Sequence, residues 1–293
     1  SEIWPLTLDG TYRRQIPVAV INGRMSARSA ARWKKASVFS RRLFNILELA
    51  IVQNQSDAET FKALGTRKIE VAGNLKSASA PLPDKEGERA ALTSTIGQRR
   101  RWVAASIHPG EDRIIFRVHQ SVRKQFSDLL TVVVPRHPDK MAEMVKAGKE
   151  LGLNFAIRSR GDAITPSTDI YFSDTMGELG VFYRLCPIAY VGKSLAVGGG
   201  QNPIEPAQLG CAVLMGPDMS NFETEAGALV DSDGGQIVAS EEGLYAALHR
   251  LLTDDGECAR MGARAASTAT ANPKPLENTL AALQPYVQGR PID

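Results

Sequence analysis

The sequence has few cysteines, few histidines and no long apolar run. Its three cysteines, Cys186, Cys211 and Cys258, are widely spaced, which argues against a disulfide framework and favours buried free thiols in a reducing compartment. The four histidines lack the spacing of a zinc site. No stretch of the printed sequence reaches the roughly 18 consecutive apolar residues of a membrane-spanning helix, and none shows the pattern of a signal peptide. These absences exclude secreted disulfide scaffolds and zinc-centred domains.

Charge is nearly balanced overall but unevenly distributed. The formal net charge is +3 over 293 residues, so the average identifies no partner. Residues 24–44 hold seven basic residues and no acid, with Trp33 and Phe39 among the interleaved aromatic side chains. A basic segment with aromatic residues is typical of a membrane surface or an anionic lipid partner, although a solvated helix face would have the same composition.

Apolar runs followed by polar turns recur along the rest of the chain. The runs are long enough for buried strands and occur at residues 102–106, 129–134, 170–172, 188–191 and 211–215. Their alternation with helical stretches predicts an α/β fold with parallel sheets, in which ligands bind at the carboxyl ends of the strands. The turns after these strands should therefore line one crevice.

The glycine run at residues 198–200 opens into a helix start. Asn202 suits an N-cap, Pro203 suits the first helical turn, and Glu205 stands where its carboxylate can reach back to the cap. Free amides at such a start bind anions, usually phosphate. A glycine loop that merely turns is the alternative.

The charge types in the crevice indicate its ligand. Arg136 is suited to a phosphate or carboxylate, and His108 and His137 can add donors beside it. Glu178 and Glu205 would repel a bare phosphate, so we expect them to accept hydrogen bonds from hydroxyl groups. Each of these residues, taken alone, has a structural explanation as well, such as a surface cation or an acid that complements a helix dipole. Together they predict a ligand that carries both phosphate and sugar.

Seven segments occur together in an order and spacing that resemble the 3-deoxy-D-manno-octulosonic acid (Kdo) transferases. They lie at residues 1–5, 22–26, 73–76, 105–111, 134–138, 174–179 and 199–206. These enzymes move Kdo from CMP-Kdo onto a lipid A precursor, lipid IVA, in lipopolysaccharide biosynthesis. The resemblance implies a GT-B glycosyltransferase, with two Rossmann-like domains, at the cytoplasmic face of the bacterial inner membrane.

The resemblance also implies roles for particular residues. The CMP contacts would fall on Pro135, Arg136, Met176, Gly177, Glu178, Asn202, Pro203, Ile204 and Glu205. Lys76 would be catalytic, stabilising the transition state as a cation near the departing CMP phosphate or the Kdo carboxylate. Without the resemblance, Lys76 would be a solvated lysine before a linker. We expect no metal and no cofactor, since CMP can depart without a divalent cation.

Two kinds of departure from the family pattern bear on mechanism. The family's general-base glutamate lies in a His-x-x-Ser-x-Gly-Glu motif upstream of Trp4 and Pro5, and the sequence lacks this motif. We therefore expect an N-terminally truncated chain that binds donor but transfers poorly. In addition, Gln201 stands where many members carry His, and Ile107 and Lys193 depart from the commonest pattern.

The sequence predicts three parts. Residues 1–83 would be the end of an acceptor-side Rossmann-like domain with a linker, residues 84–275 the CMP-Kdo-binding domain, and residues 276–293 a terminal helix that packs back on the N-terminal part. Two alternatives to the transferase stay open. A nucleotide-sugar epimerase-like enzyme would share the fold, and a nucleic-acid-binding protein would explain the basic segment but not the crevice acids.

Overall fold

The computed structural model describes residues 3–196, 198–270 and 273–287, so Ser1 and Glu2 of the first family segment lie outside it. The chain forms two compact units, residues 1–80 with 271–293 and residues 81–270. The boundaries between the units thus fall at 80/81 and 270/271, whereas the sequence predicted them at 83/84 and 275/276. Leu82 packs on the core of the larger unit, and Pro275 packs against Gly73 of the smaller one, which accounts for the shift at each division.

The smaller unit is built on a three-stranded parallel sheet. Its strands are β1 (Val18–Gly23), β2 (Leu47–Val52) and β3 (Ile69–Val71), in the order β1-β2-β3. Helices α1 (Pro5–Arg13), α2 (Ala27–Lys35), α3 (Ser37–Phe44) and α4 (Gln55–Leu64) contribute to one core around Phe44 and Phe61. Because β2 is apolar on both faces, its second face also needs a cover.

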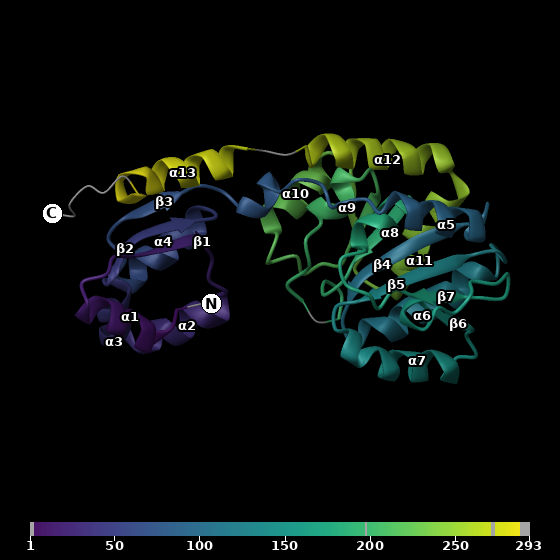
Figure 1. Cartoon of the computed structure of the whole chain (residues 1–293), viewed down its shortest axis with the longest axis horizontal. Coiled ribbons are helices and arrows are strands. Elements are labelled where there is room, and N and C mark those ends of the chain that lie inside the picture. Colours follow the sequence, from purple (N-terminus) through teal and green to yellow (C-terminus); the bar gives the residue numbers. More distant parts are fainter. Residues whose placement is uncertain (1–2, 197, 271–272, 288–293) are drawn as a thin grey trace. The chain divides into compact units, whose positions relative to one another are not determined.

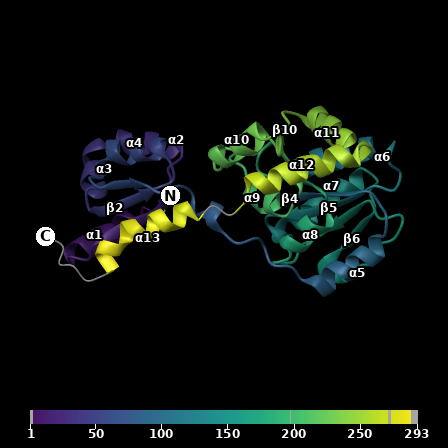
Figure 2. The ribbon, with the colours of Figure 1, turned by 90° about the horizontal axis from the view of Figure 1, so that it is seen from above.

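The C-terminal helix α13 (Lys274–Val287) provides that cover. Its residues Ala282, Leu283 and Tyr286 pack on Leu49 and Ile51 of β2, and both views show it beside the small sheet (Figures 1 and 2). The last helix of the chain therefore belongs to the same unit as the first strands.

The larger unit contains a seven-stranded sheet whose strands are all parallel. They are β4 (Arg101–Ile107), β5 (Leu130–Pro135), β6 (Phe155–Ile157), β7 (Ile170–Phe172), β8 (Ile188–Val191), β9 (Ala212–Met215) and β10 (Gly235–Ile237). Their order is β10-β9-β8-β4-β5-β7-β6. The chain enters at β4 in the middle, builds one side through β5, and then crosses to β8 on the other side. The sheet thus has its topological switch point beside β4, where open α/β sheets bind ligands.

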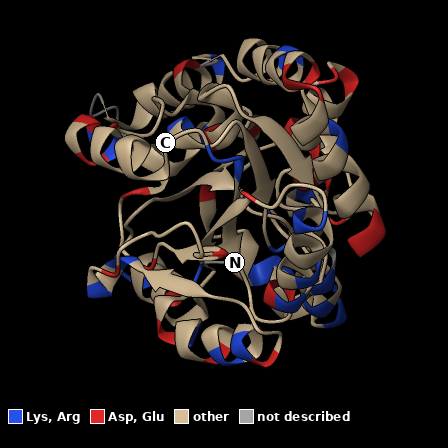
Figure 3. Cartoon of the chain, turned by 90° about the vertical axis from the view of Figure 1, so that its right-hand side faces the viewer, with Lys and Arg blue, Asp and Glu red and all other residues tan. Residues whose placement is uncertain are grey.

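Helices cover both faces of this sheet. One face carries α6 (Glu111–Arg123), α7 (Met141–Glu150) and α11 (Glu241–Thr253), together with part of α12 (Asp255–Thr268). The opposite face carries α5 (Glu86–Ile96) and α8 (Leu179–Leu185), while α9 (Ile204–Gln208) and α10 (Glu223–Asp231) pack beside β9. Along β4, Trp102 and Ala104 face one core and Val103 and Ala105 the other. Charged residues lie mostly on the helices and connecting loops, as the coloured ribbon shows (Figure 3). The predicted α/β fold with parallel sheets is confirmed.

Candidate nucleotide-sugar site

The predicted polar turns of the larger unit meet at the carboxyl ends of adjacent strands. His108 follows β4, and Arg136 and His137 follow β5, which pairs with β4. The backbone N–H of Arg136 donates to the Ile107 carbonyl (3.0 Å), and the rings of His108 and His137 meet edge to face with centroids 5.3 Å apart. Three potential hydrogen-bond donors therefore lie together at the carboxyl ends of β4 and β5.

A buried carboxylate joins the turn after β4 to the loop after β8. Glu111, the first residue of α6, is only 1% exposed. Its Oε2 accepts the backbone N–H of His108 (3.1 Å) and of Lys193 (2.7 Å), and its Oε1 accepts that of Ser194 (3.1 Å) and the hydroxyl of Tyr190 (3.2 Å). Hydrogen bonds to a carboxylate are strong, so Glu111 fixes two loops that are more than 80 residues apart in the sequence. The sequence alone does not predict this role of Glu111.

The environment of His108 is cationic and partly desolvated. Burial lowers the pKa of the His108 imidazole, and the nearby positive charges of His137, Lys193 and Arg136 lower it further, against the opposing effect of Glu111. Its Nε2 lies 3.3 Å from the side-chain amide nitrogen of Gln201, which follows the glycine run. With its pKa lowered, the His108 ring favours the neutral form and serves as a hydrogen-bonding group near Lys193 and Arg136, as suits a site for an anionic ligand.

The glycine run lies in the loop after β8, at the carboxyl ends of the strands, as expected. Gly200 has a φ of +66°, and a Cβ atom there would collide with the side chain of Met219. Gly192, directly after β8, packs so closely on β4 that a Cβ atom would lie 2.5 Å from the Ser106 carbonyl oxygen. Both positions thus require glycine, because a side chain would push the loop after β8 away from β4 at Gly192 and away from the loop after β9 at Gly200.

The helix after the glycine run differs from the prediction. It begins at Ile204, with Pro203 at the N-cap, and covers only five residues. The Asn202 side chain accepts the N–H of Ile204 (3.1 Å), and Glu205 accepts the Asn202 side-chain amide (3.1 Å). The predicted contacts of Asn202 and Glu205 are thus present, but the helix begins later than predicted, so that Asn202 forms a local side-chain turn just before the cap. So short a helix has a small dipole, and side chains must supply most of the charge for anion binding.

Glu178, after β7, is engaged inside the protein. Arg158 makes a two-point contact with its carboxylate, of which the Nη2–Oε1 distance is 2.9 Å, and Lys85 lies 3.2 Å from Oε1. Thr175 donates to Oε2 as well. The hydrogen bonds from Arg158 lower the pKa of Glu178 to about 2, against the effect of its burial. The expectation of a free acceptor for ligand hydroxyl groups is not met in this structure, because a carboxylate offers about four acceptor positions and these donors use them.

The other predicted residues of this loop and the proline at the end of β5 differ in exposure. Met176 is 80% exposed, and Gly177 has a φ of +76° in the same turn. Pro135 is buried at the end of β5, paired with Ile107 of β4. A ligand at the carboxyl ends of the strands can therefore contact the exposed turn of Met176 and Gly177. Pro135 is buried and contributes to the packing at the end of β5.

Lys76, the predicted catalytic residue, lies in the smaller unit. It is on the short 3₁₀ turn η1 (Leu75–Ala78), where its backbone N–H donates to Asn74 Oδ1 (3.2 Å). Asn22, at the carboxyl end of β1, accepts the N–H of Leu75 (3.1 Å) from a left-handed conformation with φ of 55°. Two asparagine side chains thus fix the backbone around Lys76, whose side chain is exposed.

The basic segment forms two helices, α2 and α3, separated at Ala36. Val38 is 84% exposed, and Phe39 stacks on Trp33 with centroids 6.4 Å apart. A pocket of about 570 Å³ beside α3 is lined by Arg13, Arg41 and Arg42 among other residues. No helix within the described part of the chain has both the length and the apolar character required to span a bilayer.

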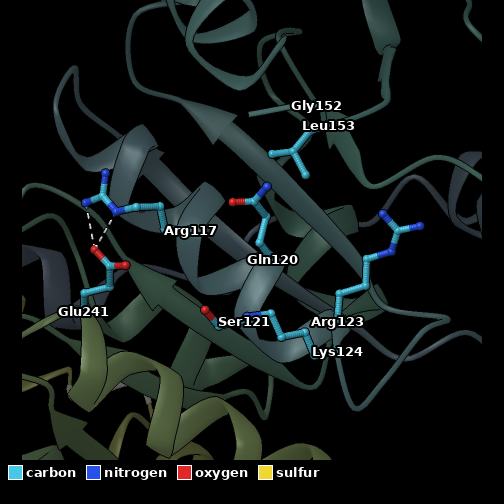
Figure 4. Close-up of a pocket in the computed structure, with 8 residues that line it drawn as sticks. All are labelled: Arg117, Gln120, Ser121, Arg123, Lys124, Gly152, Leu153 and Glu241. Atoms are coloured by element: carbon cyan, nitrogen blue, oxygen red, sulfur yellow. Dashed lines mark hydrogen bonds and ion pairs between the residues drawn. The ribbon is translucent and has the colours of Figure 1, made fainter. Parts of the chain in front are cut away.

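One further pocket of the larger unit does not coincide with the strand ends. It lies over the second half of α6 and is lined by Arg117, Gln120, Ser121, Arg123, Lys124, Gly152, Leu153 and Glu241 (Figure 4). Arg117 pairs with Glu241 (2.7 Å) and Arg123 with Asp169 (2.6 Å). Since its arginines already have partners, we assign it no ligand.

Comparisons with known proteins agree with this geometry. A family model described as 3-deoxy-D-manno-octulosonic-acid transferase (kdotransferase) matches residues 1–79. A 3-deoxy-D-manno-octulosonic acid transferase of Rickettsia felis is 30% identical over 253 residues, 86% of this chain and 54% of that protein. One from Haemophilus influenzae is 29% identical over 98% of this chain and 68% of that protein. Over most of its length, the chain is thus similar to Kdo transferases. It spans about half to two thirds of the length of these relatives.

Solved structures match both parts of the chain. The C-terminal CMP-Kdo binding domain of WaaA from Acinetobacter baumannii is 28% identical and superposes with a TM-score of 0.60, over 63% of this chain and 97% of that domain. Anabaena Alr3699/HepE in complex with UDP and glucose matches 97% of this chain with a TM-score of 0.63 at 13% identity. At 13% identity the second likeness shows a shared fold alone, whereas the first relates this chain to a CMP-Kdo binding domain in sequence as well as in fold.

Proposed function

We propose that the protein transfers Kdo from CMP-Kdo to a lipid A precursor and that the larger unit of this chain binds the CMP-Kdo donor. The observation that carries the proposal is the cluster of His108, Arg136, His137 and Gln201 at the switch point of the seven-stranded sheet. Its donors suit the phosphate of a nucleotide. The 28% identity to a CMP-Kdo binding domain supports CMP-Kdo as the ligand.

The acceptor side of the proposal concerns the smaller unit. Its α2 and α3 combine exposed Val38 and Phe39 with a run of basic residues, a composition that suits the cytoplasmic face of the bacterial inner membrane. Arg41 and Arg42 beside a pocket would bind the phosphate groups of the lipid. Lys76 would stabilise the negative charge that develops as CMP departs.

Nucleotide selectivity tests the donor assignment. CMP, UMP and AMP are added in parallel to the purified chain, and its melting temperature is measured with each. A ligand that binds only the folded state stabilises it by RT ln(1 + [L]/Kd), about 2.7 kcal/mol at a hundredfold excess over Kd. We expect a CMP-selective rise. A preference for uridine nucleotides would favour the epimerase-like alternative, and oligonucleotide binding that weakens steeply with salt would favour the nucleic-acid-binding one.

A further inference from the structure

Lys193 adopts a backbone conformation that a lysine rarely adopts. It follows Gly192 at the end of β8 and has a φ of 61°, in the left-handed region. A residue with a Cβ atom is strained there, and such strain persists only where the surrounding structure imposes it. Strained residues of this kind cluster at functional sites.

Hydrogen bonds on both sides of the residue impose this conformation. The Lys193 N–H donates to Oε2 of the buried Glu111 (2.7 Å), and the Lys193 carbonyl accepts the N–H of Gly200 (2.7 Å). Neither bond uses the lysine side chain, and a glycine would make both with less strain. The backbone therefore explains the turn but not the presence of a lysine.

The neighbours of Lys193 belong to the proposed donor site. The N–H of His108 donates to the same oxygen of Glu111, so the two backbones lie within two hydrogen bonds of each other. The following residue, Ser194, accepts the N–H of Asp218 (3.1 Å) from the loop beside the glycine run. The half-buried Lys193 side chain forms no salt bridge with the described residues, and its charge lowers the pKa of both His108 and Asp218.

We propose that Lys193 is a ligand-binding residue of the donor site, where its ammonium group binds an anionic oxygen group of the sugar nucleotide. This inference rests on the proposed function. The anionic group is either the phosphate or the sugar carboxylate of the donor, since both present the same oxygen chemistry to an ammonium group. Like Arg136 and His137, Lys193 acts electrostatically on His108, so its ammonium group adds affinity for an anion there, whereas its strained backbone adds nothing to folding.

The test compares Lys193→Gly and Lys193→Arg with the unmodified chain by calorimetric titration with cytidine, CMP and CMP-Kdo. For Lys193→Gly we expect an unchanged or raised melting temperature together with a Kd for CMP or CMP-Kdo about three- to tenfold higher, as for one charge-assisted contact at a half-buried site. Lys193→Arg should keep most of the affinity. A loss with both CMP and CMP-Kdo assigns the phosphate, and a loss with CMP-Kdo alone assigns the carboxylate.

A matched control comes from Asp233, which also has a left-handed φ of 55° but lies before β10. Asp233→Gly removes the same kind of strain and should leave every Kd unchanged. The proposal for Lys193 would be overturned if Lys193→Gly bound CMP and CMP-Kdo with unchanged affinity, or if it lost affinity for cytidine equally. In that case CMP binding by the unmodified chain would still support the proposed function. Absence of CMP binding by the unmodified chain would overturn both.

Discussion

The ion pair between Arg158 and Glu178 joins the turn after β6 to the turn after β7. Both side chains are largely buried, at 13% and 8% exposure. Replacing Arg158 by methionine leaves a buried carboxylate with Lys85 and Thr175 as its remaining partners. We expect the free energy of unfolding in urea to fall by about 2–4 kcal/mol. Arg113→Met, which breaks an exposed pair with Glu150, should change it by less than about 1 kcal/mol.

The pH dependence of this pair has a definite sign. The folded-state pKa of Glu178 is lowered from 4.5 to about 2, so its contribution to stability is fully present above pH 4.5 and is lost as the pH falls toward 2. Acid titrations of unfolding should show this loss in the unmodified chain. Glu178→Gln should lack it, and an identical acid profile in that variant would contradict the assignment.

His119 gives a second titration in a different window. Its ring is fully buried, with Nδ1 2.8 Å from the Thr131 hydroxyl oxygen, and burial lowers its pKa below the ordinary value of 6.5. Arg123 and Arg99 lower the pKa further, against the opposing effect of Asp169. Because the unfolded state then binds the proton more readily, stability should fall as the pH drops below 6.5. The difference between the unmodified chain and His119→Gln, measured from pH 8 to pH 5, isolates this contribution from that of His108. A constant difference across that range would rule it out.

At the scale of elements, the loop after β8 depends on close packing as well as on conformation. Gly200 and Gly210 both have positive φ, but only Gly200 faces another side chain, that of Met219. Gly210→Ala should lower the free energy of unfolding by about 1 kcal/mol, from backbone strain alone. Gly200→Ala should cost more and should also weaken CMP binding, because it displaces the loop that carries Gln201. Equal stability and equal CMP affinity of the two variants would contradict this account.

The elements also show how far the sequence could predict the site. The apolar runs predicted β4, β5, β7, β8 and β9 to within a residue or two of each end, because central parallel strands are apolar on both faces. The edge strands β6 and β10 have three residues each and gave no such signal. Arg158 follows β6, so its pairing with Glu178 was missed along with the strand. The role of Glu111 depends on contacts with a loop more than 80 residues away, which spacing alone does not reveal.

For the whole molecule, the division into two units predicts where donor binding resides. Every residue of the proposed donor site lies between residues 81 and 270, in a unit with its own sheet and cores. A fragment of residues 81–270 should therefore fold cooperatively and bind CMP with the same Kd as the 293-residue chain. Circular dichroism and titration of the fragment check both points. A folded fragment with much weaker CMP binding would mean that the smaller unit contributes to the CMP site.

The most direct test of the account is the affinity of the 293-residue chain for CMP, measured by calorimetric titration with and without Arg136→Ala. Arg136 is exposed at the end of β5, so its loss should leave the melting temperature nearly unchanged. We expect CMP to bind in preference to UMP and AMP, and the variant to bind it about tenfold more weakly, as for one charge-assisted contact. Equal affinity of the variant and the unmodified chain, or no CMP binding by a folded chain, would contradict the assignment of the switch point as the donor site.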